Sequence, residues 1–108
     1  MTEGPGFGLH PEAARDISEI WEYIAVDNPD AAGRIRESLF NTISSLVASP
    51  NQGILRPDLS SRSLRFKLVA NYFIAYAHEE QPLWVVAVIH GRRSPRVIAA
   101  LLRGREIT

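Results

Sequence analysis

Apolar residues in the first half of the chain recur every three or four positions, which is the interval of an amphipathic helix. One stripe lies within residues 17–24 and follows Pro11-Glu12, a favourable helix start. The other lies within residues 32–46 and follows Asn28-Pro29, an N-cap with proline at the first helical position. Because the link is short, the two helices are predicted to form an antiparallel hairpin. The apolar positions of the hairpin are Ile17, Ile20, Trp21, Ile24, Ala32, Ile35, Leu39, Ile43 and Leu46.

The second half of the chain has the apolar pattern of β-strands. Strands are predicted at residues 63–69, 72–78 and 83–90, which together form an antiparallel meander. A further short strand is expected around Phe7–Leu9. Alternation in the first strand of the meander separates two faces, one with Leu64, Phe66 and Leu68 and the other with Arg65 and Lys67.

The strand at residues 83–90 is too apolar for a sheet with one face fully in water. A short C-terminal helix, which Ser94 is predicted to cap, follows it. We expect its apolar residues either to cover the second face of the sheet or to contact a partner. These residues are Val97, Ile98, Leu101 and Leu102, and both tryptophans, Trp21 and Trp84, are expected in the core.

The predicted architecture is therefore α+β: an N-terminal helical hairpin packed on an antiparallel sheet of three to four strands, with a short C-terminal helix. The 108 residues are expected to form one domain, in which residues 1–8, rich in Gly and Pro, are flexible. The N-terminus has no features of a signal peptide. The longest apolar run has seven residues, far fewer than the ~20 that span a bilayer. We expect a cytoplasmic protein.

Charge is distributed unevenly along the chain. Residues 1–61 have four Arg and nine Asp or Glu, whereas residues 62–108 have eight Lys or Arg and three Glu. The net charge is −5 in the first part and +5 in the second, and zero overall. Two interpretations are equally compatible with this pattern: a basic face for an acidic partner, or attraction between the two halves.

The chain lacks the residues that several kinds of catalytic or binding site need. The chain has no cysteine, no nucleophile motif and no glycine-rich phosphate loop, and we expect no cofactor. A shared metal ion is not expected, because His78 and His90 fall about 23 Å apart in the predicted meander, at ~3.3 Å per residue. The carboxylates of Asp16, Glu19 and Glu22 are expected to form a solvated helix face.

The remaining candidates are basic residues. Arginine makes paired, charge-assisted hydrogen bonds to phosphates and carboxylates, so a cluster of arginines can form an anion site. The same residues can equally be a solvated sheet edge, and the spacing leaves both readings open. The set is Arg56, Arg62, Arg65, Lys67, Arg92, Arg93 and Arg96.

With these elements in order, the sequence resembles the RelE/ParE superfamily of toxins from type II toxin–antitoxin systems. The segments that carry the resemblance are LHPEAARDISEIWEYIAVDNPDAAGRI, SPNQGILRPDL, LRFKLVANYFIAY and VVAVIHGRRSP. His10 departs from the Ser or Thr that usually caps the first helix in the family. The ParE-like branch, which inhibits DNA gyrase, is favoured over the RelE-like branch of ribosome-dependent mRNA endoribonucleases.

The resemblance implies two partners, DNA gyrase and a cognate antitoxin, and no sequence-specific binding of nucleic acid. In the RelE-like alternative the chain is a metal-independent endoribonuclease. Arg65 and Arg92 then match the family's arginine positions, but no acid or base is found nearby. A third alternative is an inactive toxin fold that only binds partners. The partner-binding residues are predicted to be Arg65, Lys67, Arg92, Arg93, Arg96, Val97, Ile98 and Leu101.

Overall fold

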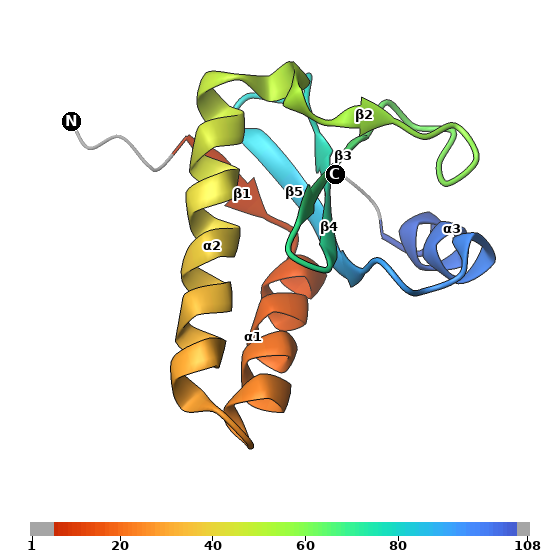
Figure 1. The fold of residues 1–108 in the computed structure, drawn as a ribbon. Coiled ribbons are helices and arrows are strands. Elements are labelled where there is room, and N and C mark those ends of the chain that lie inside the picture. Colours follow the sequence, from red (N-terminus) through yellow and green to blue (C-terminus); the bar gives the residue numbers. More distant parts are fainter. Residues whose placement is uncertain (1–5, 106–108) are drawn as a thin grey trace.

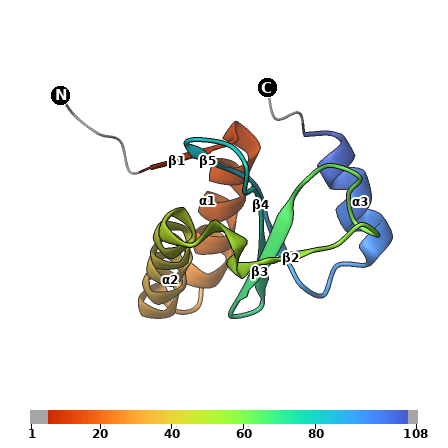
Figure 2. The same cartoon turned by 90° about the horizontal axis from the view of Figure 1, so that it is seen from above.

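A central sheet separates two helical layers in the computed structural model, which describes residues 6–105 (Figure 1, Figure 2). The helical hairpin covers one face of the sheet, and the C-terminal helix covers the other. In chain order the elements are β1 (Phe7–Leu9), α1 (Pro11–Ala25), α2 (Pro29–Ala48), the 3₁₀ turn η1 (Pro50–Gln52), β2 (Ile54–Leu55), β3 (Arg65–Val69), β4 (Tyr72–Ala77), β5 (Leu83–His90) and α3 (Pro95–Arg103). None of the described helices is long and apolar enough to cross a membrane.

Within residues 6–105 the sheet has five strands in the order β1-β5-β4-β3-β2. The predicted meander of β3, β4 and β5 and the short strand β1 are confirmed, but β1 pairs with β5 in parallel, so the sheet is mixed. The fifth strand, β2, was not predicted. It pairs with β3 through only two residues, Ile54 and Leu55, too few for an alternating pattern to be seen in the sequence.

Each helix begins with a side-chain cap followed by proline. The Oδ1 of Asn28 accepts a hydrogen bond from the Ala31 amide at 3.0 Å, and the Oγ of Ser94 accepts one from the Val97 amide at 3.3 Å. Both predicted caps are therefore confirmed. His10 takes the same role for α1, because its Nδ1 accepts a hydrogen bond from the backbone amide that lies two residues further along the chain.

Two hydrophobic cores lie on opposite faces of the sheet. The C-terminal helix covers the second face, as one of the two alternatives predicted. The core under the hairpin contains Ala13, Ile17, Leu39, Ile43, Leu46, Ile74, Tyr76, Leu83, Val85 and Val88. The core under α3 contains Leu59, Leu64, Phe66, Ala75, Ala77, Val86, Ala87, Ile89, Ile98 and Leu102.

A β-bulge in β5 interrupts the alternation of its apolar side chains between the two faces of the sheet. Ala75 is paired with Ala87 and Tyr76 with Val85, so Val86 is an extra residue without a partner on β4. Val86 and Ala87 therefore both face α3, and the alternation resumes after them. This shift directs Val85 and Val88 to the hairpin core, although three positions separate them.

Some sequence expectations are wrong in detail. Trp21 is 41% exposed, because α1 turns Ile17 toward the sheet and leaves Trp21 on the outer side of the hairpin, beside Phe40. Leu68 is also exposed and does not share the core of Leu64 and Phe66. Of the stretch expected to be flexible, residues 1–5 lie outside the described residues, and residues 7 and 8 belong to β1.

Candidate functional site

Arg65, a candidate from the sequence, lies with Lys67 on the sheet face that the hairpin covers, since it is in register with Tyr76. Its Nη1 donates to the carbonyl of Gly53 at 2.7 Å. The Tyr76 hydroxyl accepts from the Gly53 amide at 2.9 Å and donates to the carbonyl of Pro50 at 2.6 Å. Burial raises the pKa of Tyr76, and the Gly53 amide and the Arg65 charge oppose that rise. Arg65 thus fastens the turn after α2 to the sheet.

Arg65 and Arg92 do not converge on one point. Strand β4 lies between their strands, and the row of the sheet that contains His90 also contains Tyr72 and Val69. Arg65 is four residues from Val69, which is about 13 Å at ~3.3 Å per residue, and Arg92 lies beyond His90. The two guanidinium groups are therefore at different ends of the sheet.

Arg92, Arg93 and Arg96 lie in the turn after β5 and in the first turn of α3. The Arg92 amide donates to Nδ1 of His90 at 3.0 Å, and the Arg93 amide donates to the His90 carbonyl at 3.1 Å. The three arginines are exposed. Among residues 6–105, none of them has a carboxylate within 4.0 Å. Their charges are available to a partner.

The apolar residues of α3 are divided between the core and the surface. Ile98 and Leu102 are buried in the second core. Val97 is 44% exposed, and Leu101 is partly buried at the edge of the core. The part of the predicted patch that remains accessible to a partner is therefore Val97 and Leu101.

A groove with a volume of about 540 Å³ runs between α1, β5 and α3. Its floor is the end of β5, which has no neighbouring strand on this side among residues 6–105, because β1 ends its pairing at Val85 and the chain continues as α1. His90 and Tyr72 meet edge to face in it, with ring centroids 5.1 Å apart. Further lining residues include Glu19, Ile20, Tyr23, Arg93 and Leu101.

A buried ion pair bonds the backbone of β5 at the start of this unpaired edge. Arg105 donates to both carboxylate oxygens of Asp16, at 2.6 and 3.0 Å, and to the carbonyl of Val86 at 3.1 Å. Asp16 also accepts from the Val88 amide at 3.0 Å. The pair thus satisfies backbone groups that a neighbouring strand would otherwise bond. The sequence expectation that Asp16 lies on a solvated face is wrong, although Glu19 and Glu22 are exposed as expected.

The histidines lie apart from one another. His10 caps α1, His78 follows β4, and His90 ends β5. Within the described residues, no three His, Asp or Glu side chains are grouped so that they could hold a metal ion.

A comparison with protein families matches residues 8–95 to the model described as "ParE toxin of type II toxin-antitoxin system, parDE". The chain belongs to the ParE toxin family. Among solved structures, this ParE-family chain is similar to one described as "Chromosomal ParDE TA system from P. aeruginosa", with a TM-score of 0.65 and 17% identity over 78% of this chain and 92% of that one. This likeness shows a shared fold. A search of curated proteins gave no match.

The family match covers only part of the groove. It ends at Pro95, where α3 begins, so the walls made by α1 and β5 lie within the matched ParE region. The wall made by α3, together with Arg96, Leu101 and Arg105, lies beyond it. This ParE-family toxin therefore completes the groove with residues outside the matched part of the chain.

Proposed function

We propose that this chain inhibits DNA gyrase by protein–protein contact and that a cognate antitoxin neutralises it. The observation that carries the proposal is the ParE family match over residues 8–95, together with a fold like that of a ParDE toxin–antitoxin system. Both partners would be met in the cytoplasm. The separation of Arg65 from Arg92 also favours this function over ribonuclease chemistry, because two cations at different ends of the sheet cannot stabilise one phosphate transition state.

The antitoxin is proposed to occupy the groove between α1, β5 and α3. An extended segment can pair with the part of the β5 edge that follows the Val88 amide, toward His90, and place side chains against Ile20 and Leu101. Tyr23 is exposed at the groove's rim, and tyrosine is enriched at interfaces because a large rigid ring loses little entropy on binding.

The groove proposal predicts a difference between two exposed side chains of the hairpin. Tyr23→Ala is expected to weaken antitoxin binding by about 1–2 kcal/mol, as for an aromatic residue at an interface. Val26→Ala is the matched control, since Val26 is as exposed as Tyr23 but does not line the groove. Calorimetric titration measures both. Equal antitoxin affinities for the two variants would show that the antitoxin does not bind in the groove.

The target is tested with purified components. The protein is expected to block negative supercoiling by gyrase and to accumulate cleaved DNA, and an equimolar antitoxin is expected to reverse both effects. Expression without the antitoxin should stop growth. Normal growth together with unaffected supercoiling would refute gyrase inhibition and favour an inactive binding module.

One observation favours a second candidate, a RelE-like ribonuclease. His90 and Tyr72 lie together in the groove with Arg93, and these are residue types that can transfer protons and hold a phosphate. Burial raises the pKa of Tyr72, with a smaller contribution from Tyr23. Cleavage of mRNA by this protein on ribosomes, lost in His90→Ala and with gyrase unaffected, would establish this function instead.

A further inference from the structure

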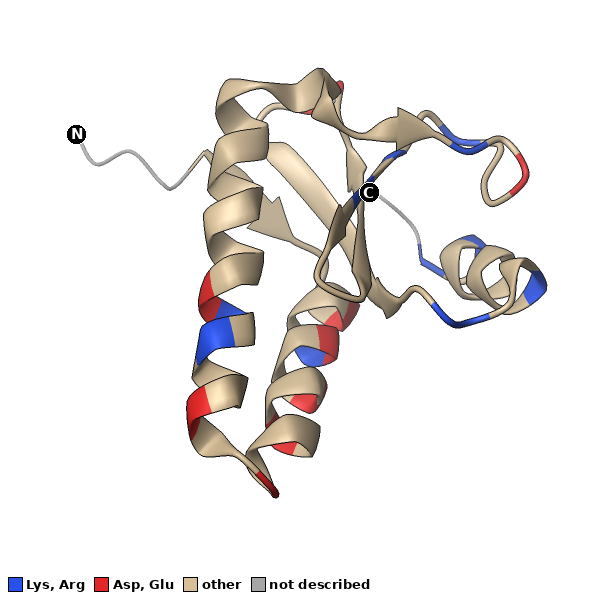
Figure 3. Ribbon diagram, viewed as in Figure 1, with Lys and Arg blue, Asp and Glu red and all other residues tan. Residues whose placement is uncertain are grey.

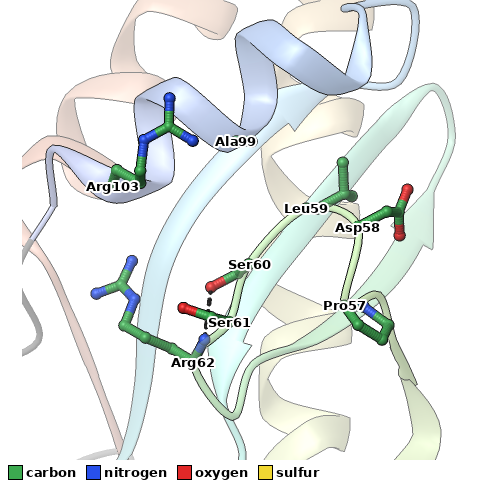
Figure 4. A pocket seen from close by; sticks show the side chains of 8 residues that line it. All are labelled: Pro57, Asp58, Leu59, Ser60, Ser61, Arg62, Ala99 and Arg103. Carbon is green, nitrogen blue, oxygen red and sulfur yellow. Dashed lines mark hydrogen bonds between the residues drawn. The ribbon is translucent and has the colours of Figure 1, made fainter.

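A basic cleft lies between α3 and the 57–62 loop, on the sheet face opposite the hairpin (Figure 4). Two hollows of about 360 and 460 Å³ form it, and they share Asp58, Ala99 and Arg103. We name it the α3 cleft and define it by Ser60, Ser61, Arg62, Arg96, Ala99 and Arg103.

Positive charge dominates the α3 cleft. Arg96 and Arg103 are seven residues apart on α3, so they lie on the same side of the helix and about 10 Å apart along its axis. Both are exposed, and within residues 6–105 neither has a carboxylate within 4.0 Å. Asp58, the one carboxylate of the cleft among residues 6–105, accepts hydrogen bonds from Nε and Nη2 of Arg56 at 2.9 and 2.7 Å, and the charge of Arg56 offsets its own.

Arg62 connects the loop wall to α3. It donates to the carbonyls of Leu102 and Arg105, which lie at the C-terminal end of the helix, where cations are favoured. These bonds use two of its five N–H donors, and its charge remains beside the cleft. The Ser60 hydroxyl accepts from the Arg62 amide and keeps its own proton to donate.

Most of the acidic residues within 6–105 belong to the hairpin and not to this cleft. Six of the ten acidic residues within 6–105 belong to α1 and α2, which cover the other face of the sheet, and a seventh, Asp27, lies in the link between these helices (Figure 2, Figure 3). Across the sheet, the hairpin and α3 are separated by two packed layers of about 10 Å each. Asp16, which lies near the end of α3, has its charge offset by its ion pair with Arg105. Since charges are largely screened beyond ~8 Å at physiological salt, the zero net charge of the chain does not cancel the local field of the cleft.

We propose that the α3 cleft binds the phosphodiester backbone of duplex DNA. The proposal rests on the proposed function, because the DNA in question is the segment that gyrase holds. Arg side chains and Ser hydroxyls are typical phosphate donors, and the small side chain of Ala99 lets a backbone approach α3 closely. Phosphates of one strand repeat every ~3.4 Å along the axis, so Arg96 and Arg103 reach phosphates about three nucleotides apart.

This contact is independent of sequence and weak in isolation. The cleft offers two or three phosphate contacts, whereas proteins that bind DNA tightly make about 6–10. On gyrase the DNA is already held close, so a few contacts suffice to add to the protein–protein contact. The cleft therefore couples the toxin to gyrase only where DNA is bound.

Fluorescence anisotropy with a labelled duplex of mixed sequence, over a series of low salt concentrations, tests the proposal. The variant is Arg96→Gln/Arg103→Gln. The control is Arg15→Gln/Arg34→Gln, which removes the same charge from exposed positions on the hairpin. We expect the wild type and the control to bind with the same salt dependence. The cleft variant should bind less tightly, with a slope of log K against log salt reduced by about two. Thermal melting by circular dichroism verifies that both variants are folded.

The outcomes separate this inference from the proposed function. No salt-dependent binding by the wild type, or equal binding by the cleft variant and the control, overturns the inference even if gyrase is inhibited. Loss of antitoxin binding in the cleft variant with DNA binding unchanged also overturns it, because the cleft then takes an acidic peptide. DNA binding that depends on the cleft, without any effect on supercoiling, refutes gyrase inhibition and leaves the cleft assignment standing.

Discussion

Removal of the Asp16 carboxylate is expected to be among the most damaging single changes to this fold. The side chains of Asp16 and Arg105 are only 15% and 9% exposed. Asp16→Ala leaves the guanidinium buried without its counter-ion and the Val88 amide without its acceptor. Breaking a buried pair by removing one partner costs about 3–5 kcal/mol. For a domain of this size, each kcal/mol lowers Tm by roughly 4–8 °C, so a loss of at least about 12 °C is expected.

Urea unfolding followed by circular dichroism measures this cost. Glu19→Ala is the matched control, because Glu19 is on the same helix, exposed, and in no ion pair among the described residues. It is expected to change stability by less than about 0.5 kcal/mol. The double variant Asp16→Leu/Arg105→Met should recover about 1 kcal/mol or more relative to Asp16→Ala, since no charge is then left buried. If Asp16→Ala costs no more than Glu19→Ala, water satisfies the strand edge and the pair does not close it.

The remaining predictions concern two glycines and a tyrosine. Gly8→Ala should destabilise the protein by about 1–3 kcal/mol, because the new Cβ would lie 2.7 Å from the ring of Trp84. Gly33→Ala should stabilise it by about 0.5–1 kcal/mol, because a Cβ at this helical position meets nothing within 4 Å. Urea unfolding measures both changes in the free energy of unfolding, and changes of the same sign would contradict this reasoning. Tyr76→Phe should cost about 1–3 kcal/mol by leaving the Gly53 amide without its acceptor, and wild-type stability in the same assay would refute that role. Because burial raises the folded-state pKa of Tyr76, its stabilising effect is present below the unfolded value of about 10 and is lost as pH rises through the folded value; unfolding curves above pH 10 should therefore decline less steeply for Tyr76→Phe.

The local elements were predictable because their causes are local. Asn28 and Ser94 each precede a proline and accept a hydrogen bond from the amide three residues further along the chain. A few neighbouring residues therefore suffice to predict where those helices begin. The hairpin and the three-strand meander follow likewise from periodicity and short links. The continuous apolar run of β5 also predicted correctly that a second layer covers the sheet, and α3 forms that layer.

The candidate site was less predictable, because it depends on which residues meet. The sequence singled out Arg65 and Arg92 for their type, yet β4 separates them, and Arg65 instead bonds Gly53. Asp16 and Arg105 are 89 residues apart, and no local pattern marks either as the other's partner.

By itself, then, the sequence determined the kinds of elements, their order, and the segregation of charge between the hairpin and the C-terminal part. The tertiary structure decided the parallel pairing of β1, the bulge at Val86 and the open edge of β5. The physical reason is that periodicity and capping act over a few residues, whereas strand order and the bonding of an unpaired edge are set by how distant segments pack. The groove and the α3 cleft arise from that packing.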